Sequence, residues 1–144
     1  MPFFYNYGVN SVILRNRLRR DGYDPEVDAV NAVYFPVDLK VRGGLAVSHR
    51  QVAGGLFVNY VDSYRDPANR ADPHVNSWTT VDLNLRYDFS GAAGAGQGTS
   101  LAFNVQNLFD RNPPFIVNSI NTGFDPTNAT ALGRFLSMTL THRW

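Results

Sequence analysis

The chain has 144 residues, the length of one ordinary domain, and 13 Lys and Arg against 12 Asp and Glu give a net charge of +1. This balance gives no electrostatic case for nucleic-acid binding, which would call for clustered basic residues, so we expect no nucleic-acid partner. The absence of cysteine excludes disulfides and thiolate metal sites. The aromatic content is high, and no apolar run approaches the roughly eighteen residues of a membrane-spanning helix. Composition therefore fits either a membrane β-barrel or a soluble β-sandwich.

Residues 1–36 are the least regular part, and we interpret them as a poorly defined strand remnant followed by a loop. The aromatic residues at 3–7 suit a strand, and 12–18 suit a strand or a short helical turn. Residues 19–25 are turn-like because they contain Asp, Gly and Pro. The positive charges follow the first apolar residues instead of preceding them, which is unlike a signal peptide. For an exported protein we therefore expect that Met1 is not the native start.

From residue 37 onward, apolar and polar residues alternate with the period of two that is typical of β-strands. Strands are expected at about 37–50, 56–65, 77–89, 101–106 and 135–144. Connections are expected at 51–55, 66–76, 90–98 and 107–133. Their lengths go short, long, short, long, which is the asymmetry of outer-membrane barrels with tight periplasmic turns and long outer loops. We therefore assign the loops at 66–76 and 107–133 to the outer side.

The expected strand at 77–89 places Asp82, Asn84, Arg86 and Asp88 on one face and apolar residues on the other. The polar face must contact water, because burying a polar group without a hydrogen-bond partner costs about 2–7 kcal/mol of free energy. Two interpretations satisfy this requirement: a soluble sandwich with one face in solvent, or a membrane barrel with a polar lumen. Aromatic residues near the expected strand ends favour the membrane. They are Tyr60, Tyr64, Trp78, Tyr87, Phe89 and Trp144.

The last ten residues alternate strictly and finish on Trp144. Leu136, Met138 and Leu140 share a face with His142 and Trp144, and the other face is mostly polar. A strand of this kind is typical of a transmembrane β-barrel, in which the terminal aromatic residue lies in the interfacial girdle.

Several segments together resemble the TonB-dependent outer-membrane receptors. Residues 78–87 (WTTVDLNLRY) resemble the antepenultimate barrel strand of this family. Residues 103–114 (FNVQNLFDRNPP) look like the penultimate strand with its Asn-Leu-Phe-Asp exit. The pairs at 124–125 and 133–134, leading into the last strand, are similar to the closing segment of the family. In order and spacing, the resemblance covers roughly residues 37–144.

The resemblance implies an all-β fold, in which the chain is an antiparallel meander of about five to six transmembrane strands. These strands would be the C-terminal segment of a 22-stranded barrel, whose lumen is closed by a plug domain. The whole receptor would import a scarce ligand such as a siderophore, cobalamin or a carbohydrate, with energy supplied through TonB. Residues 37–144 match only the last strands, so transport by this polypeptide alone is not expected.

The same resemblance implies a location and partners. As part of the receptor, the chain would lie in the bacterial outer membrane and contact its lipid. It would need the missing plug domain and the remaining barrel strands, and it would reach TonB only through the missing N-terminal region. The outer-membrane assembly machinery would read a C-terminal signal composed of Leu136, Met138, Leu140 and Trp144.

The candidate binding residues project from the polar faces of the expected strands. They are Arg42, Arg86, Asn104 and Gln106, and contact with the plug is the alternative to contact with a ligand. Nothing in the sequence identifies the ligand. A further expectation is that Arg134, beside Gly133, anchors the outer end of the last strand, and binding of an anionic ligand is the alternative.

An enzyme is the least supported hypothesis, and we expect no cofactor or metal. His49, His74 and His142 lie on different elements, and the Gly-rich stretch at 91–100 lacks the Lys of a phosphate-binding loop. A pocket that brings His49 to Asp82 would revive the enzyme hypothesis. The main alternative to the receptor is a soluble β-sandwich binding domain.

Overall fold

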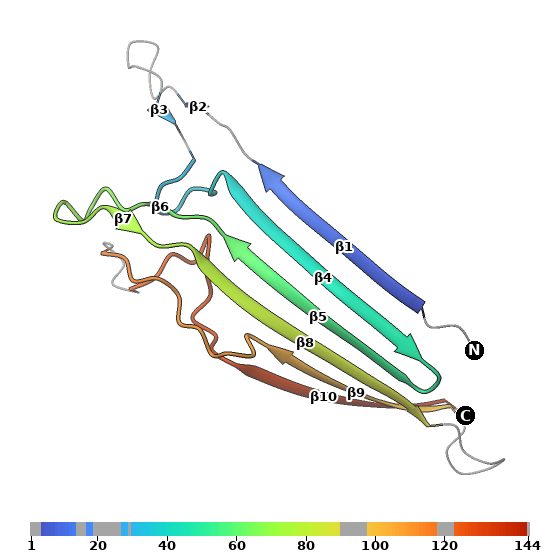
Figure 1. Ribbon diagram of the computed structural model, residues 1–144. Helices are drawn as coiled ribbons and strands as arrows, with labels where there is room; N and C mark the ends of the chain where they lie inside the picture. The colour runs from blue at the N-terminus through green and yellow to red at the C-terminus, as the bar shows by residue number, and fades with distance from the viewer. Residues whose placement is uncertain are drawn as a thin grey trace.

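The computed structural model describes residues 4–13, 17–18, 27–28, 30–89, 98–117 and 123–143 (Figure 1). Within these ranges the fold is all-β, as the sequence predicts, and no helix there is long and apolar enough to cross a membrane. The strands are β1 (Phe4–Ile13), β2 (Arg17–Leu18), β3 (Val27–Asp28), β4 (Leu39–His49), β5 (Val52–Val61), β6 (Tyr64–Arg65), β7 (His74–Val75), β8 (Trp78–Phe89), β9 (Thr99–Gln106) and β10 (Phe135–His142).

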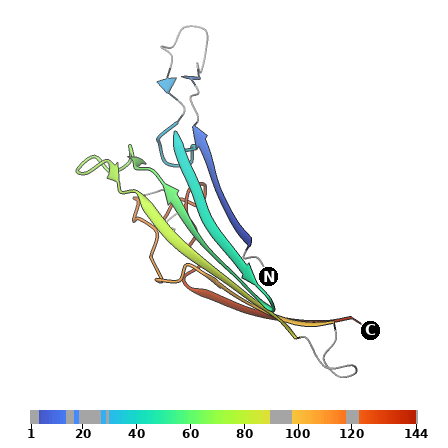
Figure 2. The same ribbon diagram turned by 45° about the vertical axis from the view of Figure 1, so that its right-hand side comes forward.

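The long strands form one six-stranded antiparallel sheet in the order β1-β4-β5-β8-β9-β10. Each long strand pairs with the long strand that precedes it along the chain, so the sheet is a meander, as expected. The strand remnant proposed for the first residues is β1, and it pairs with β4 over its whole length. Figure 2 shows the long strands side by side in one twisted sheet, and the two short ribbons, β2–β3 and β6–β7, at its loop-bearing end.

The expected hairpin link at 51–55 is wrong. Residues Arg50 and Gln51 alone connect β4 to β5, and His49 pairs directly with Val52. Arg50 adopts the left-handed backbone conformation, with φ of 52°, that such a tight connection requires. The glycines that suggested the link, Gly54 and Gly55, lie instead inside β5.

The second expected strand, at 56–65, is also corrected. β5 ends at Val61, and Tyr64–Arg65 forms the separate strand β6, which pairs with β7 inside the expected loop at 66–76. The last strand, expected at 135–144, ends at His142. Trp144, the turn-like stretch 19–25 and most of the 90–98 connector lie outside the described residues.

The strand register separates apolar from polar side chains. Leu45, Leu56, Leu83 and Val105 are partners across four adjacent strands, and Leu136 extends the row onto β10. Apart from Val105, which is buried, this apolar face is exposed to a degree that is unusual for a folded chain: Met138 is 72% exposed and Leu140 is 69% exposed. The other exposed apolar residues of this face are Leu45, Val52, Leu56, Val58, Leu85, Tyr87, Phe89, Phe103 and Leu136.

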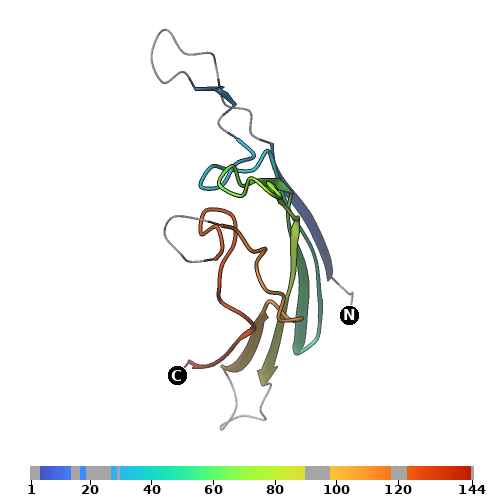
Figure 3. The ribbon, with the colours of Figure 1, turned by 90° about the vertical axis from the view of Figure 1, so that its left-hand side faces the viewer.

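The buried hydrophobic core lies in the loops at one end of the sheet. Val33, Val37, Tyr64, Val75 and Ile116 pack together there, and Val61 contacts them from the end of β5. We call this body the loop cap; it consists of residues 30–38, 62–77, 107–117 and 123–134. Figure 3 shows that the 107–117 and 123–134 parts of the cap lie on one side of the sheet. The cap therefore covers one sheet face near its loop-bearing end.

Candidate functional site

The polar face of the sheet is organised around the carboxylate of Asp82 on β8. Arg42 on β4 forms an ion pair with Asp82 at 3.3 Å and also donates a hydrogen bond to Asn59 on β5. The amide of Asn59 in turn donates to Asp82 at 2.9 Å. Because positions 42, 59 and 82 lie on the same face in the register, the network joins three neighbouring strands.

The other oxygen of Asp82 fixes the point where the chain leaves β9. It accepts the backbone N–H of Asn107 at 3.1 Å, while the N–H of Leu108 donates to the carbonyl of Val81 at 2.7 Å. Asn107 has a φ of 52°, and its side chain bonds both the N–H and the carbonyl of Arg111. The Asn-Leu-Phe-Asp segment is therefore a tight exit turn that is fastened to the middle of the sheet.

Asp110, the last residue of that turn, joins the two ends of the following loop. Its carboxylate accepts the N–H of Arg134 at 2.7 Å and lies 4.0 Å from the Arg134 guanidinium. A Cβ on residue 133 would come within 2.7 Å of the same carboxylate, so a larger residue there would displace the Asp110 side chain. Arg134, which was expected to anchor the outer end of the last strand, therefore lies beside Asp110 at the base of the loop.

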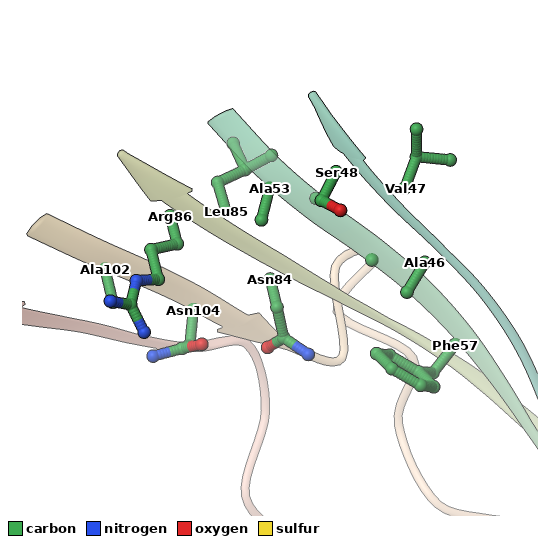
Figure 4. Close-up of a pocket in the computed structure, with 12 residues that line it drawn as sticks. Ala46, Val47, Ser48, Ala53, Phe57, Asn84, Leu85, Arg86, Ala102 and Asn104 are labelled. Carbon is green, nitrogen blue, oxygen red and sulfur yellow. The ribbon is translucent and has the colours of Figure 1, made fainter. Parts of the chain in front are cut away.

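A hollow of about 410 Å³ lies on the polar face between β4, β5, β8 and β9. In Figure 4, Asn84, Arg86, Asn104 and Phe57 project to one side of the sheet, and Leu85 projects to the other. Small residues leave the space open between these larger side chains: Ala46, Ser48, Ala53, Gly55 and Ala102. Arg86 forms an exposed ion pair with Asp88 at 2.7 Å.

A second hollow, of about 300 Å³, lies between the polar face and the loop cap. Arg42, Trp78 and Gln106 line it from the sheet, and Thr130 and Leu132 line it from the loop. Guanidinium and amide donors with an aromatic side chain can bind a ligand that carries oxygen acceptors.

The four candidate binding residues thus share one face but do not form a single cluster. Arg42 and Gln106 line the hollow under the cap, whereas Arg86 and Asn104 line the open hollow nearer the β4–β5 turn. The C-terminal residues Leu136, Met138 and Leu140 are exposed on the apolar face.

The pocket that would support an enzyme is not formed. His49 pairs with Val52 at the β4–β5 turn and faces the apolar side with Leu45, whereas Asp82 lies on the polar face, opposite Phe57 in the middle of β5. Within the described ranges, no group of three or more His, Cys, Asp or Glu side chains is placed to hold a metal ion.

Two buried carboxylates in the loop cap were missed by sequence reasoning. Asp66 is 2% exposed and Asp125 is 0% exposed, and backbone N–H groups surround both. The sequence does carry a signal, because both residues begin the same tetrapeptide pattern, Asp-Pro-Xaa-Asn, at 66–69 and 125–128. Tyr64 lies beside them: burial, followed by the negative charge of Asp125, raises the pKa of its hydroxyl well above the usual value.

Part of the chain is similar in sequence to a known transporter. Over 69 residues, 48% of the chain, it is 39% identical to the ferrichrome outer membrane transporter/phage receptor of Escherichia coli (strain K12). That stretch spans 8% of the length of the transporter. No protein-family model and no solved structure matches the chain. The chain therefore combines an open all-β antiparallel sheet with local similarity to an outer membrane transporter.

Proposed function

We propose that this chain forms the C-terminal strands of the barrel of a TonB-dependent outer-membrane receptor, which takes up a scarce ligand such as a siderophore, cobalamin or a carbohydrate. The observation that carries the proposal is the division of one sheet into two different faces. Apart from His142 at the end of β10, the exposed side chains of one face are apolar on β4, β5, β8, β9 and β10. The other face carries charged and amide side chains and is partly covered by the loop cap.

Water alone is a poor environment for so large an apolar face, which must be covered by lipid or by a second sheet. In the described part of the chain, the remaining strands are two short ribbons, and neither pairs with the large sheet. Lipid is therefore the covering that this arrangement supports, with the polar face directed to the lumen. A soluble β-sandwich needs a second layer on the apolar face.

The sheet is open at β1 and at β10, and open backbone edges are prohibitive in lipid. The proposal therefore includes the remaining barrel strands and a plug domain as partners, and the chain does not transport alone. Contact with TonB would be made through the N-terminal region of the full receptor. Leu136, Met138, Leu140 and Trp144 would act as the assembly signal.

Under this proposal, the loop cap lies at the outer mouth of the barrel. The hollow beneath it, with Arg42 and Gln106, faces a ligand that enters from outside. The other hollow, with Arg86 and Asn104, lies deeper in the lumen, where contact with the plug is favoured.

The test uses two adjacent positions at the same depth on β8. Because the chain lacks cysteine, Leu85→Cys and Asn84→Cys each provide one site for a nitroxide label. With the chain folded into lipid vesicles, we expect the label at position 85 to collide preferentially with oxygen, which concentrates in lipid. The label at position 84 is expected to collide preferentially with a water-soluble nickel chelate.

Equal accessibility at the two positions, or the opposite preference, contradicts the proposal. So does a chain that stays soluble and monomeric in aqueous buffer without detergent. That last result supports the soluble binding domain instead.

A further inference from the structure

The two Asp-Pro-Xaa-Asn segments of the loop cap adopt the same local structure. In each, the Oδ1 atom of the Asp accepts the N–H of the residue two positions later: Ala68 donates to Asp66 at 3.0 Å, and Thr127 donates to Asp125 at 2.9 Å. In each, the N–H of the Asn donates to the carbonyl of the Asp. These bonds close a compact turn that holds the carboxylate in a fixed direction.

In both turns, the second carboxylate oxygen binds a different segment of the chain. The Oδ2 atom of Asp66 accepts the N–H of Val117 at 2.7 Å, across 51 positions. The Oδ2 atom of Asp125 accepts the N–H of Tyr34 at 3.2 Å, across 91 positions. One carboxylate thus ties the 62–77 segment to 107–117, and the other ties 123–134 to 30–38.

Further bonds complete the connection between these segments. Arg65 donates its N–H to the carbonyl of Asn31 at 2.9 Å, and the N–H of Val33 donates to the carbonyl of Arg65 at the same distance. The side chain of Asn128 donates to the carbonyl of Phe35 at 2.8 Å. Every segment of the cap is therefore bonded to another segment, around the shared core of Val33, Val37, Tyr64, Val75 and Ile116.

The carboxylate bonds are costly to break separately. Both carboxylates are almost completely buried, so opening one segment removes a donor from a buried carboxylate and leaves it only the bonds within its own turn, unless that turn is also released to water. Hydrogen bonds to an ionised acceptor are also stronger than those between neutral groups. Opening of one segment should therefore promote opening of the next.

We propose that Asp66 and Asp125 are paired latches that make the loop cap open and close as one cooperative body. The inference rests on contacts within the cap and is independent of the membrane placement proposed above. It has a consequence for the hollow beneath the cap. Its loop wall, Thr130 to Gly133, is held between Asp125 on one side and the Asp110–Arg134 pair on the other, so the hollow is preformed and opens only with the whole cap.

Amide hydrogen exchange of the full chain in detergent micelles tests this directly. In Asp125→Ala, the amide of Tyr34 loses its acceptor, and its exchange should accelerate about ten- to hundredfold. Cooperative opening predicts a comparable acceleration at Val117, whose acceptor Asp66 is intact. Asp66→Ala should give the reciprocal result and accelerate exchange at Tyr34.

Asp72 provides the matched control. It also precedes a proline in the 62–77 segment, but its carboxylate is exposed and accepts the N–H of His74 in its own turn. We expect Asp72→Ala to leave exchange at Tyr34 and Val117 unchanged. Acceleration confined to the direct partners of each substituted Asp overturns the proposal, because it shows that the segments open independently.

Protection of the β8 and β9 amides reports whether the sheet persists in each variant. If Asp125→Ala loses this protection, Asp125→Asn replaces it, because Asn keeps one oxygen acceptor and the size of the side chain. The cooperative latch then predicts a smaller acceleration that is still shared between Tyr34 and Val117. An acceleration at Tyr34 alone contradicts it.

Discussion

Among the charged side chains of the sheet, Asp82 has the largest structural role. Its two oxygens serve Arg42 and Asn59 on the neighbouring strands and the backbone of Asn107 at the exit from β9. Its side chain is 16% exposed, whereas that of Asp88 on the same strand is 50% exposed and pairs with Arg86. Asp82 and Asp88 lie on the same strand, but we therefore expect them to contribute differently to the free energy of unfolding.

We expect Asp82→Ala to lower the free energy of unfolding by about 2–3 kcal/mol, because it removes the acceptor that Arg42, Asn59 and the backbone N–H of Asn107 share. Asp88→Ala should change it by less than about 1 kcal/mol, as is usual for an exposed ion pair. Urea titration of both variants in the same micelles measures the difference. Equal effects would show that the Asp82 network contributes no more than a surface pair.

The sequence predicts some of these residues and not others, for a physical reason. Alternation with period two is a local property, so it correctly assigns Asp82, Asn84 and Arg86 to one face. The partners of Asp66 and Asp125 lie 51 and 91 positions away, and no local period encodes such contacts. The repeated Asp-Pro-Xaa-Asn pattern predicts two turns, but it does not predict which groups the second carboxylate oxygen of each Asp binds.

At the scale of the strands, the glycines of β4 and β5 have a packing function. The ring of Phe57 lies over Gly44, where a Cβ would overlap it, and also contacts the position of a Cβ at Gly55. The guanidinium of Arg42 lies 4.9 Å from the centroid of the same ring. Glycine in a strand interior allows this close approach of an aromatic ring. These residues therefore do not mark a turn, and this is why the predicted link at 51–55 was wrong.

We expect replacement of glycine by alanine to change the free energy of unfolding differently on the two faces of the sheet. Gly44→Ala should destabilise the chain by about 1–3 kcal/mol, because the Phe57 ring must move away from the sheet. Gly54, on the apolar face, has room for a Cβ at 3.4 Å from Leu85, so Gly54→Ala should be neutral or stabilising by up to about 1 kcal/mol. Thermal unfolding of the two variants measures both effects, and a cost at Gly54 equal to that at Gly44 contradicts this explanation.

At the scale of the molecule, the main property is that the sheet is not closed. Among the described strands, β1 and β10 each have one neighbour, so each presents a row of backbone donors and acceptors on its other side. Neither the number of strands nor the absence of closure follows from alternation alone. The pairing of β1 was not predicted from the sequence, because residues 1–36 have no regular period to identify it.

We expect the isolated chain in mild detergent to associate through these edges, with an apparent mass that rises with concentration. Thr139→Lys, on the polar face of the edge strand β10, should reduce association because a charged side chain on an edge opposes pairing. Asn84→Lys places the same charge on the same face of the central strand β8 and should have no such effect. Analytical ultracentrifugation compares the variants, and equal association by both would exclude the edges as the contact.

The pairing of Asp110 with Arg134 has a consequence for how this protein can evolve. Since the two ends of the 111–133 segment are held together at its base, the entropy of closing the loop grows only slowly with its length. Insertions, deletions and exchanges within the segment can then accumulate without shifting the register of β9 against β10. A lineage could in this way acquire a new loop surface while inheriting the paired strands unchanged.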